Sequence, residues 1–70
     1  MKVYVTFGQI HVHSVNGKTF DKDSIASIEC ENYADGRRLA FEYFGPQFFT
    51  TYRVVDDEML SFYPRGIIEV

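Results

Sequence analysis

Hydrophobic and polar residues alternate with a period of two along much of this chain, a pattern that is typical of β-strands. In the first segment Val3, Val5 and Phe7 alternate with Tyr4 and Thr6, and these residues are of the β-branched and aromatic types that strands prefer. Later segments of the chain show the same alternation of apolar and polar residues. We therefore predict strand segments over residues 3–7, 24–31, 48–55 and 67–70.

Residues 32–45 have the residue spacing of a helix. Asn32 is a good N-cap, Asp35 follows three residues later in a capping-box-like arrangement, and Gly45–Pro46 ends the helix. A glycine costs about 1 kcal/mol in a helix interior, so we expect Gly36 to allow a close approach between helix and sheet. The stripe that we expect to be buried consists of Gly36, Leu39, Ala40, Tyr43 and Phe44.

The phase of the apolar residues changes at Gly8, because Ile10 and Val12 follow at even positions. A β-bulge at Gly8–Gln9 would return Ile10 and Val12 to the face that Val5 occupies. In the alternative interpretation the strand stays regular, and its two halves are buried on opposite faces. Both interpretations place Ile10 and Val12 in the interior.

Turn-forming residues separate the predicted elements. Asn16–Gly17 is a strong signal for a two-residue hairpin turn, because both turn positions require a positive φ. Residues 21–23 are predicted to form a second turn or a loop, and residues 64–66 a turn. We expect residues 56–58 to be an exposed acidic loop. Residues 59–63 are either a short strand or an irregular segment.

The order of the elements, β-β-α-β-β, predicts a single α+β domain over residues 1–70. We expect one antiparallel or mixed sheet, with the helix at about 32–45 packed on one of its faces. One helix covers one side only, so the opposite face would meet water, a partner or a second copy of the chain. An aromatic sheet face that is open to water is costly, which favours a homodimer.

Composition and charge narrow the function classes. Phe and Tyr make up 17% of the 70 residues, more than such a core requires, so we expect some rings at a binding surface. Cys30, the single cysteine, excludes an internal disulfide and is expected to be buried. The net charge of −3 disfavours direct binding to nucleic acid. With no signal-peptide pattern and no long apolar stretch, we expect a soluble, cytoplasmic protein that makes no membrane contact.

His11 and His13 are the residues that most suggest chemistry. At positions i and i+2 of a strand both imidazoles would project to one side, where they are weak candidate metal ligands. Further ligands would have to come from Glu29, Glu31 or Cys30, and the alternative is two ordinary histidines on a solvated face. The chain carries no catalytic or phosphate-binding motif, so we expect no enzyme and no cofactor. A metal-binding or catalytic mini-domain that uses the two histidines is the rival hypothesis.

Acidic residues suggest a different role. Carboxylates spaced along a sheet can imitate phosphates and occupy a basic groove of a protein that binds nucleic acid. The alternative is that they keep an aromatic-rich domain soluble. We predict that these acids, together with exposed Tyr and His side chains, form a partner-binding surface. Its residues are Asp56, Asp57, Glu58, Glu29, Glu31, Tyr52, His11 and His13.

Four motifs carry a family resemblance that spans nearly the whole chain. They are Tyr4-Val-Thr-Phe-Gly-Gln9, His13…Asn16-Gly-Lys-Thr-Phe-Asp21, Gly36-Arg37…Ala40-Phe41-Glu42…Phe44-Gly45 and Tyr63-Pro-Arg-Gly66. The chain resembles small proteins encoded by bacteriophages and prophages, and loosely the class of anti-CRISPR and other anti-defence inhibitors. That resemblance implies binding to a host protein or protein complex in the bacterial cytoplasm, and it implies no site at the level of residues. A structural or self-assembling phage component is the other class that stays open.

Overall fold

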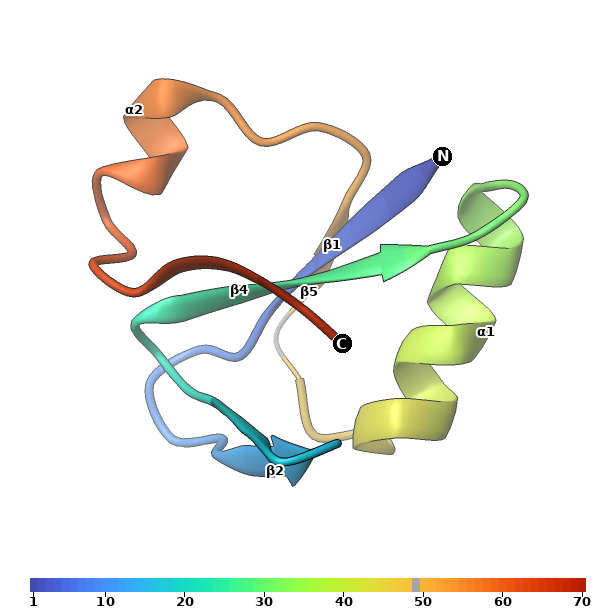
Figure 1. Cartoon of the computed structure of the whole chain (residues 1–70), viewed down its shortest axis with the longest axis horizontal. Helices are drawn as coiled ribbons and strands as arrows, with labels where there is room; N and C mark the ends of the chain where they lie inside the picture. Colours follow the sequence, from blue (N-terminus) through green and yellow to red (C-terminus); the bar gives the residue numbers. More distant parts are fainter. Residues whose placement is uncertain (49) are drawn as a thin grey trace.

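The computed structural model describes residues 1–48 and 50–70 and confirms the α+β class (Figure 1). The strands are β1 (Lys2–Thr6), β2 (His13–Val15), β3 (Lys18–Phe20), β4 (Ser24–Glu29), β5 (Thr50–Tyr52) and β6 (Gly66–Glu69). The helices are α1 (Tyr33–Phe44) and α2 (Asp57–Leu60). Four of the strands form one sheet in the order β5-β1-β4-β6, and β2 and β3 pair separately.

Strands β1 and β4 form the centre of the sheet. They pair antiparallel, with Val3 opposite Ile28 and Val5 opposite Ala26. Strand β5 adds antiparallel to β1, and β6 adds parallel to β4, so the sheet is mixed. All residues of β4 from Ser24 to Ile28 are buried, because this strand has neighbours on both of its edges and cover on both of its faces.

A turn at Gly8–Ile10 takes the chain out of the sheet before β2 begins. Gly8 has a φ of 67°, a left-handed conformation that glycine adopts without a steric penalty. Both sequence interpretations of Ile10 and Val12 are wrong, because these side chains are 83% and 68% exposed. The expectation of a single sheet is also wrong, because β2 and β3 form a two-stranded sheet of their own.

The predicted hairpin turn at Asn16–Gly17 is confirmed. Asn16 and Gly17 have φ values of 53° and 77°, and β2 and β3 pair in register on either side of them. The hairpin brings Phe20 into the core, where its ring centroid lies 5.8 Å from that of Phe7 and 5.5 Å from that of Phe44. The contact between Phe20 and Phe44 is edge-to-face, and aromatic pairs of this kind are favourable beyond the area that they bury.

Helix α1 has the predicted ends. The Asn32 side chain accepts a hydrogen bond from the Asp35 backbone amide at 2.8 Å. At the other end Gly45, with a φ of 63°, donates its backbone amide to the Phe41 carbonyl at 2.8 Å. Both caps satisfy backbone groups that a helix leaves without internal partners, which is why local sequence was sufficient to place this helix.

The buried side of α1 is narrower than predicted. Gly36, Ala40 and Phe44 are buried at four-residue spacing, and Leu39 is half-buried. The prediction that Tyr43 is buried is wrong, because this side chain is 40% exposed. Gly36 and Ala40 are small, so the helix lies close to β1 along this one row.

One short helix corrects two predictions about the acidic segment. Asp56 is the N-cap of α2, and its side chain accepts a hydrogen bond from the Met59 backbone amide at 2.8 Å. Asp57 and Glu58 form the first helical turn, where negative charge is favoured. The expected acidic loop is therefore the start of a helix, and Met59 and Leu60 are neither strand nor irregular.

The strand predicted over residues 48–55 is shorter than expected. Only Thr50–Tyr52 pairs with β1, and Phe49 lies outside the described residues. Arg53 has already left the sheet, and its guanidinium carbon lies 4.5 Å from the centroid of the Tyr33 ring in α1. Strand β4 likewise ends at Glu29, before the predicted end of the 24–31 segment.

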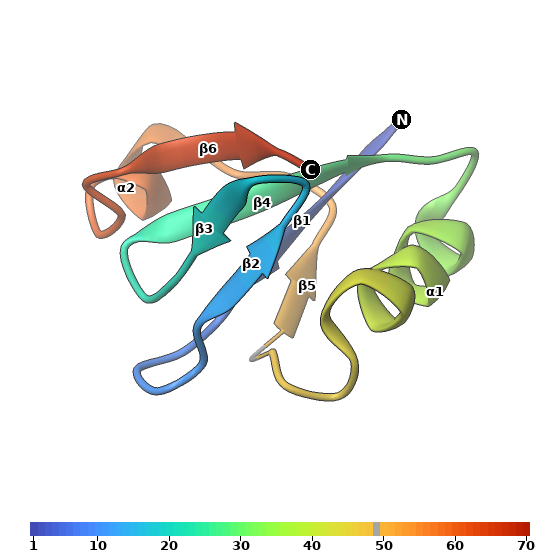
Figure 2. The same ribbon diagram turned by 60° about the horizontal axis from the view of Figure 1, so that its bottom comes forward.

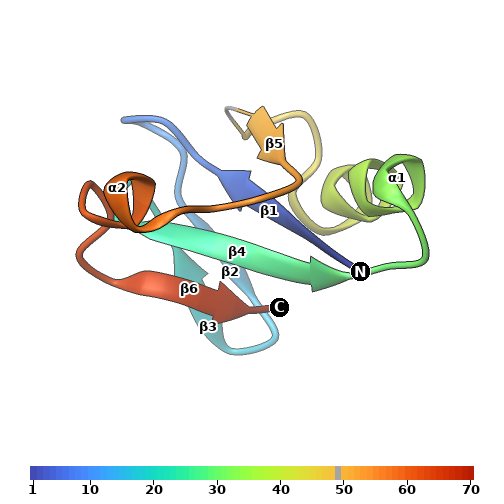
Figure 3. The same cartoon turned by 90° about the horizontal axis from the view of Figure 1, so that it is seen from above.

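The two faces of the sheet are covered differently. Helix α1 and the β2–β3 hairpin lie on one side, and α2 lies on the other (Figure 1 and Figure 2). Seen from above, α2 lies near the start of β4 and away from its end (Figure 3). Thr6 and Ile25, on the α2 side, are fully buried. The expectation of an uncovered face therefore holds for only part of it, around the end of β4.

Candidate functional site

A row of neighbouring side chains crosses the sheet on the face opposite α1. Tyr4 stands opposite Tyr52 on β5 and opposite Ser27 on β4, and Ser27 stands opposite Glu69 on β6. Directly opposed residues share a face of the sheet. Val3 packs under α1, so its neighbour Tyr4 and the whole row point to the other side.

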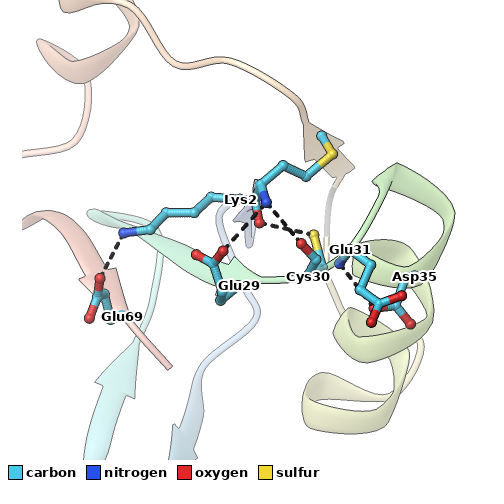
Figure 4. Close-up of polar contacts among 7 residues, drawn as sticks. Lys2, Glu29, Cys30, Glu31, Asp35 and Glu69 are labelled. Atoms are coloured by element: carbon cyan, nitrogen blue, oxygen red, sulfur yellow. Dashed lines mark hydrogen bonds and ion pairs between the residues drawn. The ribbon is translucent and has the colours of Figure 1, made fainter.

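A salt bridge crosses the sheet beside this row. Lys2 stands opposite Glu29, yet its ammonium group donates a hydrogen bond to Glu69 Oε1 at 2.7 Å, so the side chain spans β4 (Figure 4). The side chains of Glu29 and Glu69 are 72% and 71% exposed. The hydrogen bond from Lys2 lowers the pKa of Glu69, and the same bond raises the pKa of Lys2.

Ser27 lies beneath this salt bridge. Its residue exposure is 3%, and its hydroxyl oxygen has no hydrogen-bond partner within the described part of the chain. A buried hydroxyl without a partner costs free energy, so such a group calls for an explanation. Ser27 also lines a cavity of about 390 Å³ together with Lys2, Ile28, Glu29, Tyr43, Glu69 and Val70.

Glu31 and Asp35 interact with each other at the start of α1. The Glu31 backbone amide donates to Asp35 Oδ2 at 3.4 Å (Figure 4). Arg38 donates to Asp35 Oδ1 at 2.7 Å. The hydrogen bond from Arg38, and then that from the Glu31 amide, lowers the pKa of Asp35. Arg38 also pairs with Glu42 at 2.7 Å, so these charges form a local network on the helix surface.

The acids of α2 lie on the same side of the sheet as Tyr52 and Glu29. Asp56 uses its carboxylate as a helix cap, whereas Asp57 and Glu58 are exposed in the first turn. Of the eight residues that the sequence predicted for partner binding, Asp56, Asp57, Glu58, Glu29 and Tyr52 thus lie on this side of the sheet, with the three acids of α2 near the start of β4 and Glu29 at its end. The structure adds Lys2, Ser27, Tyr4 and Glu69 to this surface. The alternation of residues along each strand predicts which face these side chains occupy, but it does not predict which strands pair.

His11 and His13 lie apart from this surface. His11 precedes β2 and His13 is its first residue, so the expectation that both stand on one strand is wrong. The His13 ring centroid lies 5.7 Å from that of Phe7 and 5.2 Å from that of Phe44. Its Nε2–H donates to the Gln47 carbonyl at 2.6 Å, which leaves only Nδ1 for any ligand. His13 therefore joins the hairpin to the segment that follows α1.

Among residues 1–48 and 50–70, no three His, Cys, Asp or Glu side chains are placed to hold a metal ion. Cys30 is buried, as predicted, and its thiol lies 3.4 Å from the Met1 carbonyl. Neither α1 nor α2 in the described chain is long and apolar enough to cross a membrane.

A second hollow lies at the other end of the molecule. The turn after β1 and the segment after α2 border a groove of about 490 Å³, lined by Gly8, Gln9, Lys22, Phe62 and Tyr63. Phe62 is 72% exposed. Ile10 and Val12, in the segment between β1 and β2, are also exposed, at 83% and 68%.

Comparison of the chain with protein-family models, with curated proteins and with solved structures finds no match.

Proposed function

We propose that this chain is a protein-binding module that contacts its partner through the open part of the sheet face opposite α1. The observation that carries the proposal is the adjacent pair Tyr4 and Tyr52, both half-buried, beside the exposed carboxylates of Glu29 and Glu69. Aromatic side chains at the centre and charged groups at the rim are the usual anatomy of a protein interface. Tyrosines also contribute often to binding hot spots.

The charge of the surface favours a basic partner. The chain has a net charge of −3, and the exposed acids Asp57 and Glu58 stand on the same side as Glu29 and Glu69. Complementary charge increases the rate of encounter and selects among partners. The acids can act in simple protein binding, or they can imitate the phosphates of nucleic acid in a basic groove.

The biological setting that we propose is a bacterial host cell. The motifs in residues 4–9, 16–21, 36–45 and 63–66 resemble those of small phage and prophage proteins. A host protein or protein complex, such as a component of a defence system, is the partner class that this resemblance favours. The open sheet face supplies the contact surface for such an inhibitor.

The test is capture of a partner from bacterial lysate by the tagged chain. A stoichiometric host protein is expected, and its binding should fall about tenfold or more in the double variant Tyr4→Ala, Tyr52→Ala. Ile10→Ala is the matched control, because Ile10 is an apolar residue that is 83% exposed away from this face. Circular dichroism should confirm that each variant is folded. Failure to recover a stoichiometric partner, or equal losses in both variants, contradicts the proposal.

A second candidate function is self-assembly. The observation that favours it is the exposure of three apolar side chains, since Ile10, Val12 and Phe62 are each more than two-thirds exposed. Exposed apolar surface of this kind promotes association. Light scattering over a wide concentration range is the test, and a discrete monomer at the highest concentration would remove this candidate.

A further inference from the structure

We propose that the Lys2–Glu69 salt bridge occupies a binding position for an arginine side chain of the partner protein. This inference rests on the proposed function and names the chemistry that the open face recognises. In the free chain Lys2 holds the position with its own ammonium group, 2.7 Å from Glu69 Oε1. In the complex Lys2 withdraws and a guanidinium replaces it.

Charge complementarity is the first argument. The Lys2 ammonium compensates the Glu69 carboxylate, and its hydrogen bond is the main reason that the pKa of Glu69 is lowered. Lys18 is nearby, but it donates to the backbone carbonyl of Glu69 at 2.6 Å and leaves the carboxylate to Lys2. When Lys2 leaves, the exposed Glu69 carboxylate loses its cation, whereas the adjacent Glu29 carboxylate still faces the N-terminal ammonium of Met1 at 3.4 Å.

The hydroxyl of Ser27 is the second and independent argument. It is buried, it lacks a hydrogen-bond partner in the described residues, and it lines the same cavity as Glu29 and Glu69. The register places Ser27 between Tyr4 and Glu69, so the Lys2 side chain crosses β4 next to it. The Lys2 ammonium has three N–H donors, yet it bonds to Glu69 and makes no hydrogen bond to this hydroxyl.

A guanidinium matches this set of acceptors better than an ammonium group. It presents five N–H donors in a planar fork, so it can serve a carboxylate and a hydroxyl at the same time. The cavity of about 390 Å³ also extends to the α1 side of the sheet, where Ile28, Tyr43 and Val70 give it apolar walls. Those walls suit the methylene stem of an arginine, which long basic side chains bury against apolar surface.

Displacement of Lys2 requires little free energy. Its side chain is 41% exposed, and exposed ion pairs contribute little because water and salt screen them. Lysine side chains are also flexible, so withdrawal restores rotamer freedom that offsets the lost contact. Lys2 therefore occupies the position beside Glu69 in the free chain, and an arginine side chain that binds more strongly can replace it.

The test titrates isotopically labelled protein with N-acetyl-arginine methylamide and follows the amide signals by NMR. Saturable shifts are expected at Ser27, Glu29 and Glu69. The citrulline analogue, which has nearly the same shape without the charge, should produce no saturable shift. The lysine analogue should bind more weakly than arginine. Equal binding of the citrulline or the lysine analogue, or shifts located elsewhere on the protein, would overturn the inference.

Three variants separate recognition from a structural role. Lys2→Ala should bind the arginine probe about two- to fivefold more tightly, since a competitor of modest strength is removed. Glu69→Gln should weaken binding about tenfold. Ser27→Ala should also weaken binding, although it removes a costly buried hydroxyl and should not destabilise the fold. Unchanged affinity in Lys2→Ala or in Ser27→Ala would contradict the proposed site.

The two proposals fail in different ways. If lysate capture yields a partner whose binding is indifferent to Glu69→Gln, the arginine site is wrong and the binding function stands. If the arginine probe binds as expected and no partner is captured, the site stands and the proposed function is wrong.

Discussion

Gly36 of α1 lies directly against Val3 of β1. A Cβ atom built on Gly36 would be 2.7 Å from Val3 Cβ, and it would also be 2.9 Å from the sulfur of Cys30. Real Cβ atoms do not approach other atoms so closely, so the separation between helix and sheet depends on the missing side chain at this position. The helix could not occupy its present place with any other residue at position 36.

Gly36→Ala should therefore destabilise the protein, although alanine is the better helix former by about 1 kcal/mol. Overpacking of a core contact typically costs about 1–3 kcal/mol, and we expect a net loss in that range in urea denaturation. Arg37→Ala, at an exposed neighbouring position, should change the free energy of unfolding by no more than about 0.5 kcal/mol. An increase in stability on Gly36→Ala would show that helix and sheet are not in close contact.

The two histidines should differ in their contribution to stability. His13→Ala removes ring contacts with Phe7 and Phe44 and the hydrogen bond to the Gln47 carbonyl, so we expect a loss of about 1–3 kcal/mol. His11→Ala should cost about 0.5 kcal/mol or less. Thermal denaturation of the two variants under identical conditions is the measurement. Similar losses at both positions would rule out the packing role assigned to His13.

A hydrogen bond between Tyr33 and Thr51 connects α1 to the edge strand β5. The phenol oxygen lies 2.6 Å from Thr51 Oγ1 and 3.3 Å from the Thr51 carbonyl oxygen. Tyr33→Phe should cost about 1 kcal/mol, and so should Thr51→Val. Because the two groups bond to each other, the double variant should lose less than the sum of the two single losses. If the two losses add strictly in this double-mutant cycle, the hydrogen bond contributes nothing to the free energy of unfolding.

Stability should fall as the solution becomes acidic. The carboxyl groups of Glu69 and Asp35 have lowered pKa values in the folded chain, because Lys2 and Arg38 respectively donate hydrogen bonds to them. A group with a lowered folded-state pKa stabilises the fold above its unfolded pKa and loses that effect as the pH falls through the folded value. Denaturation midpoints measured from neutral pH to below about pH 4 should show this decline.

The matched variant for this titration is Glu69→Gln, which removes one of the two shifted groups. Its decline with falling pH should be shallower than that of the parent chain. High salt should reduce the difference between them, because both salt bridges are exposed to solvent. A decline that is identical in the variant and in the parent chain would mean that Glu69 has the same pKa in the folded and unfolded states.

Local features of the fold were predictable because their causes lie within a few residues. The hairpin turn follows from the φ values that Asn16 and Gly17 tolerate, and α1 follows from its cap at Asn32 and its end at Gly45. The wrong predictions also have local causes, which the hydrophobic pattern does not reveal. Gly8 permits a turn as readily as a bulge, and Asp56 caps a helix as readily as it lies in a loop.

The sequence by itself determined the fold class, the one long helix, the hairpin and the side of each strand on which a residue stands. These properties depend on backbone preferences and on alternation, which act over short distances along the chain. Only the tertiary structure decided that β4 lies between β1 and β6, and therefore that Lys2 reaches Glu69 across Ser27. Strand pairing between distant segments depends on packing of the whole core. No short stretch of residues encodes it, so the candidate surface became visible only in three dimensions.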